Sequence, residues 1–365
     1  MRGRRGALAI LAAVGVALAL LILNRAERVT FLPDRDLDRA PNLLLPERRM
    51  PALYAADANA QRVGWTPDTL FESARGWRAV GDLATAAAYT ERALSLAEAR
   101  EPSWSGRVTA LRFRAEIHLE TYQWARAGDA LVALLDSVDA STSDATWAAF
   151  RLGVIRAPLS SDALPWLDLA LREPAYANLV NTLRRAVGDP IQVGIALVDA
   201  EMWGDAESAF TIALDDPRDV VTTATALAYG GWARDQGGLD GGAWIERAVA
   251  LAPNLVVVRY LQGLHLRHVG DDRGSLRALI VAAALNPTDP ALFAELGTAY
   301  GRVGDADSAE RWLNEAVRLS RGDPRFSALL GEFRAAHANE LRAYVSRLLP
   351  MGVELPPDYA RNAAR

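Results

Sequence analysis

The stretch LGTAYGRVGDADSAERWLNEAVRLSRGDP, residues 296–324, determines how the rest of the chain is interpreted. Gly297, Gly301 and Gly304, followed by Asp305, Asp307 and Glu310, raise the question of a phosphate-binding or metal-binding loop. The glycines are spaced G-x3-G-x2-G, which is not the G-x-G-x-x-G of nucleotide-binding turns, and no strand precedes them. A calcium loop beginning at Asp305 would need glycine at its sixth position and glutamate at its twelfth, but Glu310 and Ala316 stand there. The glycines and acidic residues of this stretch are therefore expected to have a structural role and not to form a binding loop.

The same pattern occurs elsewhere in the chain with a period of 34 residues, which indicates a repeat architecture. Five positions show it: Gly263, Gly270, Asp271, Ala282 and Leu285 recur as Gly297, Gly304, Asp305, Ala316 and Leu319. Gly-Asp pairs also stand at 81–82 and 204–205. A glycine in a turn and an aspartate at the start of the next helix explain all four pairs. Apolar residues at helical spacing, without a convincing alternating strand, predict an all-α fold.

The period and its residues resemble the tetratricopeptide repeat, a helix–turn–helix unit with Leu-Gly, an aromatic residue, Gly-Asp, alanine and a closing proline. Residues 290–323 carry this pattern most completely, through Phe293, Leu296-Gly297, Tyr300, Gly304-Asp305, Ala309 and Ala316. The resemblance implies stacked helical hairpins in which glycine and alanine allow close packing. Each hairpin leaves an apolar face that the next must cover, so a right-handed superhelical solenoid is expected.

The repeat divides the chain into segments. We expect tetratricopeptide-like repeats over 65–141 and 190–323, an irregular helical insert over 142–189 where Pro158, Pro165 and Pro174 break the helices, a capping helix over 324–349 and a tail over 350–365. Prolines also predict an extended stalk over 25–64.

The N-terminus predicts membrane attachment. Arg2, Arg4 and Arg5 lie in a short tail, residues 1–5, before an apolar segment, 6–24, with no small-x-small cleavage site. An uncharged run of eighteen residues, from Gly6 to Leu23, would span about 27 Å as a helix, close to the hydrocarbon thickness of a bilayer. An uncleaved signal anchor is therefore expected, with a cleaved signal peptide as the alternative. The basic tail would stay in the cytoplasm and place the repeat domain outside it.

Composition excludes several classes of function. A 51% share of hydrophobic residues allows a substantial core, and a net charge of −5 argues against nucleic-acid binding. The absence of cysteine excludes thiol catalysis, zinc–thiolate sites and disulfides. All of the basic residues are arginines. No catalytic, metal or cofactor motif is recognisable, so an enzyme is not expected.

The resemblance implies a concave groove lined by the first helix of each repeat. On that mapping an arginine recurs near the end of the first helix, and an aromatic and an aliphatic residue form an apolar floor. These predicted groove residues are Arg78, Arg234, Tyr260, Leu264, Arg267, His268 and Arg302. An arginine row suits carboxylates or phosphates. The alternative is that these arginines are only solvent-exposed side chains at helix ends, next to the turns.

Histidines and tryptophans provide weaker signals. His265 and His268 lie three residues apart, a spacing that two metal ligands could use, but no third ligand is evident, and a solvated or groove-facing pair is the preferred interpretation. Trp77, Trp232 and Trp312 are expected in the core.

Together these features predict a membrane-anchored, non-catalytic scaffold whose groove holds a protein or peptide partner, acidic in character. Assembly or maturation of an envelope complex is the role implied by the resemblance. The alternative is an accessory module that binds envelope glycan, which exposed aromatic side chains along the groove would favour. A deep pocket with converging carboxylates within 142–188 would instead favour an enzyme.

Overall fold

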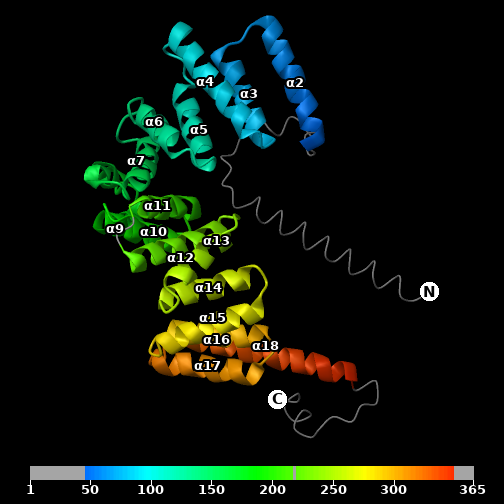
Figure 1. Cartoon of the computed structure of the whole chain (residues 1–365). Coiled ribbons are helices and arrows are strands. Elements are labelled where there is room, and N and C mark those ends of the chain that lie inside the picture. The colour runs from blue at the N-terminus through cyan, green and yellow to red at the C-terminus, as the bar shows by residue number, and fades with distance from the viewer. Residues whose placement is uncertain (1–45, 217–218, 349–365) are drawn as a thin grey trace, which may run out of the picture. The chain divides into compact units, whose positions relative to one another are not determined.

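The computed structural model describes residues 46–216 and 219–348, and this part of the chain is helical throughout, without strands (Figure 1). The prediction of an all-α solenoid is confirmed. The predicted anchor, residues 6–24, the tail before it and the tail over 350–365 lie outside the described residues. Within the described residues, no helix is both long enough and apolar enough to cross a membrane.

The chain divides into two compact units, Met1–Leu96 and Ala97–Arg365. The first unit contains α2 (Pro46–Val63), α3 (Pro67–Ala79) and most of α4 (Leu83–Arg100). The second begins with α5 (Arg107–Glu120), α6 (Trp124–Leu135), α7 (Ser143–Arg156), η2 (Ser161–Ala163), α8 (Leu164–Ala170), η3 (Pro174–Tyr176), α9 (Ala177–Ala186), α10 (Pro190–Asp199) and α11 (Trp203–Asp215). It continues with α12 (Val220–Gln236), α13 (Gly242–Leu251), α14 (Val256–His268), α15 (Asp272–Leu285), α16 (Pro290–Arg302), α17 (Ala306–Leu319) and α18 (Pro324–Leu348).

Three of the hairpin turns follow one local rule. Gly81, Gly270 and Gly304 each have φ of +87°, a left-handed conformation that glycine adopts without steric cost. The aspartate after each glycine accepts a hydrogen bond from a backbone N–H three residues on; Asp305, for example, accepts from Ser308 at 3.0 Å. These contacts confirm the turn and helix-start interpretation of three Gly-Asp pairs.

At the fourth pair, Gly204-Asp205, the prediction of a turn glycine is wrong, although Asp205 lies in the first turn of α11 as expected. The left-handed residue between α10 and α11 is Glu201, with φ of +57°, and α11 has already begun at Trp203. Asp205 instead accepts two hydrogen bonds, 2.9 and 3.1 Å, from the Arg151 guanidinium of α7. Burial raises the pKa of Asp205, although the charge of Arg151 and its hydrogen bonds oppose this effect.

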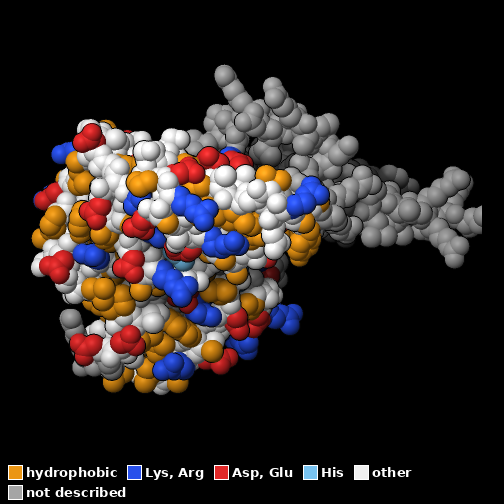
Figure 2. Space-filling model, turned by 90° about the horizontal axis from the view of Figure 1, so that it is seen from above, with side chains coloured by type: hydrophobic (Ala, Val, Ile, Leu, Met, Phe, Trp, Pro, Cys, Tyr) orange, Lys and Arg blue, Asp and Glu red, His pale blue; other side chains and the backbone are white. Residues whose placement is uncertain are grey.

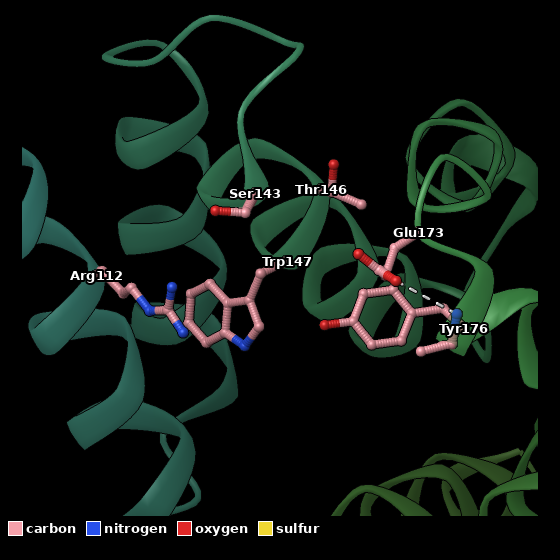
Figure 3. A pocket seen from close by; sticks show the side chains of 7 residues that line it. Arg112, Ser143, Thr146, Trp147, Glu173 and Tyr176 are labelled. Atoms are coloured by element: carbon pink, nitrogen blue, oxygen red, sulfur yellow. Dashed lines mark hydrogen bonds between the residues drawn. The ribbon is translucent and has the colours of Figure 1, made fainter. Parts of the chain in front are cut away.

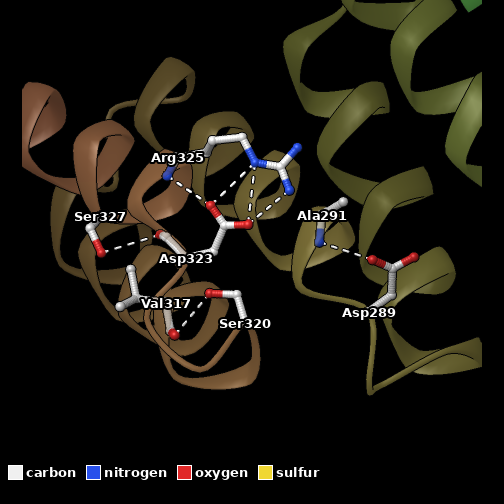
Figure 4. Close-up of polar contacts among 7 residues, drawn as sticks. All are labelled: Asp289, Ala291, Val317, Ser320, Asp323, Arg325 and Ser327. Atoms are coloured by element: carbon white, nitrogen blue, oxygen red, sulfur yellow. Dashed lines mark hydrogen bonds and ion pairs between the residues drawn. The ribbon is translucent and has the colours of Figure 1, made fainter.

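Aspartate followed by proline begins several other helices. Asp289 accepts a hydrogen bond from the Ala291 N–H at 2.9 Å at the start of α16, and Asp323 accepts one from the Arg325 N–H before α18 (Figure 4). The carboxylate satisfies a backbone donor that lacks a helical partner, and proline is favourable as the first helical residue. The local sequence therefore fixes these helix starts.

Glycine also allows the two helices of a hairpin to pack closely. A Cβ added at Gly297 of α16 would lie 2.8 Å from Leu313 Cγ and 3.0 Å from the Ala309 carbonyl oxygen of α17. Gly263 of α14 has the same relation to Leu279 of α15, at 2.7 Å. The predicted role of these glycines in helix spacing is confirmed.

Successive hairpins share apolar clusters. One cluster joins α15, α16 and α17 through Leu279, Phe293 and Ala316, and α18 adds Phe326 and Leu329 at its edge. A second joins α12, α13 and α14. Trp77 is buried as expected, whereas Trp232 and Trp312 are half-buried at the edges of these clusters.

The prolines predict an extended stalk, but residues 46–63 form helix α2 of the first unit. The helix begins at Pro46, a position where a missing N–H removes no helical hydrogen bond. Its Asp57 carboxylate accepts three hydrogen bonds: from Ser73 Oγ at 2.7 Å, from Trp77 Nε1 at 3.1 Å and from the Tyr89 hydroxyl at 2.8 Å. This carboxylate ties α2 to both α3 and α4, a long-range contact that proline spacing does not reveal.

Replacing Gly297 with alanine tests the close packing. We expect Gly297→Ala to lower the free energy of unfolding by about 1–3 kcal/mol, because the Ala309 carbonyl cannot move away without shifting the backbone. Gly331 of α18 is the matched control, since no atom lies within 4 Å of an added Cβ. Gly331→Ala should raise the free energy of unfolding by about 0.5–1 kcal/mol. Urea denaturation measures both; equal effects of the two substitutions would contradict the packing argument.

The Asp57–Tyr89 contact predicts a pH dependence. Burial, together with the hydrogen bond and negative charge of Asp57, raises the pKa of Tyr89 to about 12. Because this value exceeds that of an unfolded tyrosine, about 10, the phenol's contribution to stability is complete below pH about 10 and is lost as pH rises through 12.

Absorbance at alkaline pH measures the ionisation of tyrosine. The difference between the titration curves of wild type and Tyr89→Phe gives the ionisation step of Tyr89. Asp57→Asn should move the Tyr89 step to lower pH, whereas Glu98→Gln, an exposed charge removal, should leave it in place. A Tyr89 step that stays in place in Asp57→Asn would refute the role of the carboxylate.

Candidate functional site

The predicted groove arginines all lie in the last turn of a first helix: Arg78 in α3, Arg234 in α12, Arg267 in α14 and Arg302 in α16. Arg78 belongs to the first unit, where its side chain is half-buried. The other three lie in the last turns of the first helices of successive hairpins of the second unit; Arg234 and Arg302 share one repeat position, which His268 occupies in α14, next to Arg267. The helix-end location is therefore as the sequence indicates.

Each arginine in the second unit is paired with a carboxylate. Arg234 pairs with Glu207 of α11, Arg267 Nη1 lies 2.6 Å from Glu295 of α16, and Arg302 Nε lies 2.6 Å from Asp272 of α15. Each pair joins one hairpin to its neighbour. The arginine side chains keep 27%, 28% and 45% of their surface exposed and their carboxylate partners 17%, 27% and 33%, so the pairs of Arg234 and Arg267 are partly buried and that of Arg302 is the most solvated.

These pairs determine what the arginines can bind. Their charge is balanced in the free protein, so an acidic ligand must exchange with a carboxylate of the scaffold. The guanidinium groups are also held in place before a ligand arrives; Arg234 additionally donates to the Asp240 carbonyl at 3.0 Å and lies over the Trp244 ring. On the face shown in Figure 2, acidic and basic side chains are interspersed, with no block of one sign among the described residues.

Of the two residues predicted for the groove floor, Leu264 is buried and Tyr260 is half-buried, so little of either side chain is accessible to a ligand. Leu264 is only 6% exposed and belongs to the cluster of α12, α13 and α14. Tyr260 is half-buried and packs against the clusters on both sides of α14. Burial, reinforced by Glu295, raises the pKa of Tyr260 to about 12. Both side chains therefore connect hairpins, and Tyr260 alone keeps appreciable exposed surface.

The histidines do not form a pair. His265 Nδ1 lies 2.7 Å from the Asp235 carboxylate, which is 2% exposed and also accepts the Gly241 N–H at 2.9 Å. His268 is exposed and lies edge-on to Trp232, with ring centroids 6.5 Å apart. The expectation of a solvated pair is wrong for His265, because a buried carboxylate of the preceding hairpin binds it. No cluster of His, Asp and Glu suited to a metal ion exists in the described part of the chain.

The irregular insert holds a pocket. Between α7 and α10 the chain forms two short α-helices and two 3-10 turns; Pro165 is the second residue of α8, and Pro174 begins η3. A pocket of about 220 Å³ opens among α5, α7 and η3 (Figure 3). It is lined by Arg112, Ser143, Thr146, Trp147, Glu173, Ala175 and Tyr176.

Aromatic stacking and ion pairing fix the pocket walls. The Arg112 guanidinium lies 4.6 Å from the Trp147 ring centroid and is bound by Asp144 at 2.6 Å and Glu116 at 3.1 Å. Burial alone would lower the pKa of Arg112, but its hydrogen bonds with Asp144 and Glu116 raise it overall. Tyr176 stacks on Phe150, with centroids 4.2 Å apart and the rings 10° from parallel.

The Tyr176 phenol is neutral at physiological pH. Burial raises its pKa, and Glu173 adds to this rise while Arg112 and Arg151 oppose it. Glu173 is the one carboxylate among the lining residues. The lining residues carry no recognisable sequence motif. The one signal in the sequence is the segment 142–189, whose prolines interrupt the repeat.

Comparisons with known proteins do not extend these findings. No family model and no curated protein matches the chain. A tetratricopeptide repeat protein from Parabacteroides merdae is similar at 13% identity and a TM-score of 0.35, with 74% of this chain and 99% of that one covered. YrrB, described as a TPR protein with an unusual peptide-binding site, is similar at 19% identity and a TM-score of 0.33, with 59% of this chain and all of that one covered. A thermophilic TPR protein of Thermus thermophilus, TTC0263, shows 14% identity, a TM-score of 0.26 and coverage of 73% and 98%.

Proposed function

We propose that this chain is a non-catalytic scaffold that binds a protein or peptide partner along the first helices of its hairpins. The observation that carries the proposal is the recurrence of a last-turn arginine on α12, α14 and α16, each held by a carboxylate from a neighbouring hairpin. Side chains ordered before binding lose less conformational freedom when a ligand arrives. An acidic segment of the partner would replace the scaffold carboxylates one by one.

A protein partner is preferred over a glycan. Glycan binding would favour exposed aromatic rings along the first helices. Among the described residues the large exposed aromatic side chains are Tyr54 and Tyr122, and neither belongs to α12, α14 or α16. Tyr260 and Trp232, which are on those helices, are partly covered by neighbouring hairpins. Charged and aliphatic surface therefore dominates there.

The partner-binding role is tested by removing the arginine charges. The triple variant Arg234→Gln, Arg267→Gln and Arg302→Gln should reduce capture of the partner at least tenfold in a crosslinking pull-down, with helicity retained because the apolar clusters between the hairpins are unchanged. The matched control replaces Arg247, Arg277 and Arg311, exposed arginines of the second helices, with glutamine. Equal capture by both triple variants would rule out the arginine row.

We further propose that residues 6–24 anchor the chain in a membrane, with residues 1–5 cytoplasmic and the repeats outside, where the scaffold would serve assembly or maturation of an envelope complex. The support is the run of uncharged residues behind three arginines. The helices that the structure describes give no information on the membrane anchor or on the envelope complex.

A topology reporter tests the anchor. Alkaline phosphatase fused after Arg365 should be active, because it folds only outside the cytoplasm, and the fusion should sediment with membranes. Replacing Ala12 and Val16 with arginine should release it from the membrane fraction, since two charges in the apolar segment oppose insertion. Activity of a cytoplasmic reporter at the same position would show the topology to be reversed or absent.

A further inference from the structure

We propose that the pocket of the irregular insert, lined by Trp147, Glu173 and Tyr176, binds the basic side chain, arginine or lysine, of a protein. The inference rests on the proposed function only in taking the natural ligand to be a protein. The site is separate from the arginine row and has the opposite charge preference.

The pocket walls are aromatic and are held in place. Trp147 lies between Arg112 and Tyr176 in Figure 3, and all three line the same pocket. Tyr176 is backed by Phe150 at 4.2 Å, so its ring has little freedom to turn. Aromatic faces attract cations through their quadrupole. The Arg112 guanidinium, 4.6 Å from the Trp147 centroid, shows that this indole already accommodates such a group.

The charges in and around the pocket favour a cation over an anion. Arg112 is its positive group, and Asp144 and Glu116 both bind it at hydrogen-bond distance. Each arginine of the row has one carboxylate partner, whereas an anionic ligand at Arg112 would have to displace two. The lining residue Glu173 and the two partners of Arg112 together supply three negative groups against one positive group. The nearby Arg151 is neutralised by Asp205.

Glu173 supplies the charge that a ligand would meet. Its side chain is exposed, lines the pocket, and makes one long contact, 3.5 Å, with the Ala175 N–H. It forms no ion pair with any residue that the structure describes. In Figure 3 it lies on the Tyr176 side of Trp147, away from Arg112. A guanidinium or ammonium group near Trp147 and Tyr176 could thus pair with Glu173.

Two residues with hydroxyl groups, Ser143 and Thr146, also line the pocket. Thr146 donates its proton to the Thr142 carbonyl at 3.1 Å, so its oxygen remains an acceptor. Acceptors suit a ligand that carries only N–H donors, as arginine and lysine side chains do. The volume, about 220 Å³, suits a single long side chain rather than a helix.

The test uses the full-length chain and small probes. Nα-acetyl-arginine amide and Nα-acetyl-lysine amide are titrated while the indole N–H signals are followed by NMR; Trp147 is assigned among the ten tryptophans by its loss in Trp147→Phe. We expect saturable shifts of the Trp147 signal with both basic probes, and none with the glutamine or glutamate analogues. Raised salt should weaken the binding.

Variants locate the binding. Glu173→Gln keeps the shape and the backbone contact but removes the charge, and should weaken binding of the arginine probe about tenfold. Glu246→Gln, an exposed charge removal on α13, should leave it unchanged. The proposal is overturned if the basic probes do not saturate, if Glu173→Gln binds as well as wild type, or if the glutamate analogue binds equally.

The outcome is independent of the arginine row. The triple glutamine variant of Arg234, Arg267 and Arg302 should bind the arginine probe as wild type does, even where capture of the partner is lost. Loss of probe binding in Glu173→Gln, conversely, should leave the arginine pairs of α12, α14 and α16 intact. A failure of either proposal can therefore be recognised without reference to the other.

Discussion

A helical hairpin of this chain cannot bury its own apolar surface, so the next element along the chain has to cover it. Within a hairpin, the close approach of the two helices at Gly263 or Gly297 buries the surfaces that face each other. Between hairpins, the shared apolar clusters bury the surface that remains. Phe293 of α16 and Leu279 of α15 pack in one cluster although they belong to different hairpins. Stability of the second unit is therefore distributed along the chain, as expected of a solenoid. Helix α18 packs on the last hairpin with Phe326 and Leu329.

Buried and half-buried carboxylates add directional contacts to the apolar packing between elements. Asp235 receives both a backbone N–H of its own hairpin and the His265 ring of the next. Asp57 receives donors from two helices of the first unit, and Asp205 receives the Arg151 guanidinium from α7. A carboxylate inside a protein is favourable only when such donors are present. These contacts thus specify how elements meet as well as adding stability.

The regular and irregular parts of the second unit offer different chemistry. In the regular hairpins, arginines and carboxylates of neighbouring hairpins compensate each other, and under the proposed function this polar face receives an acidic segment of a partner. In the insert, helices broken near Pro165 and Pro174 leave a pocket whose aromatic walls and Glu173 favour a positive group. A partner that presents both acidic and basic side chains would engage both. Departure from the repeat is what creates the second kind of site.

Local signals in the sequence determined much of this protein. Glycine at the left-handed turn positions, aspartate at helix starts and apolar residues at helical spacing act within a few residues of one another, so the hairpins over 256–323 could be predicted from them. The Gly204-Asp205 pair shows the limit of such reasoning. Glu201 takes the left-handed turn there, and a distant arginine binds Asp205.

Only the tertiary structure decided which charges meet. The partners of Arg267 and Arg302, the burial of Leu264 and the contact between His265 and Asp235 depend on how hairpins stack, and no local pattern encodes that. The docking of α2 through Asp57 and the pocket around Trp147 are likewise made by side chains that are far apart in sequence. Helix formation is a short-range property of a chain, whereas a binding site depends on contacts between elements.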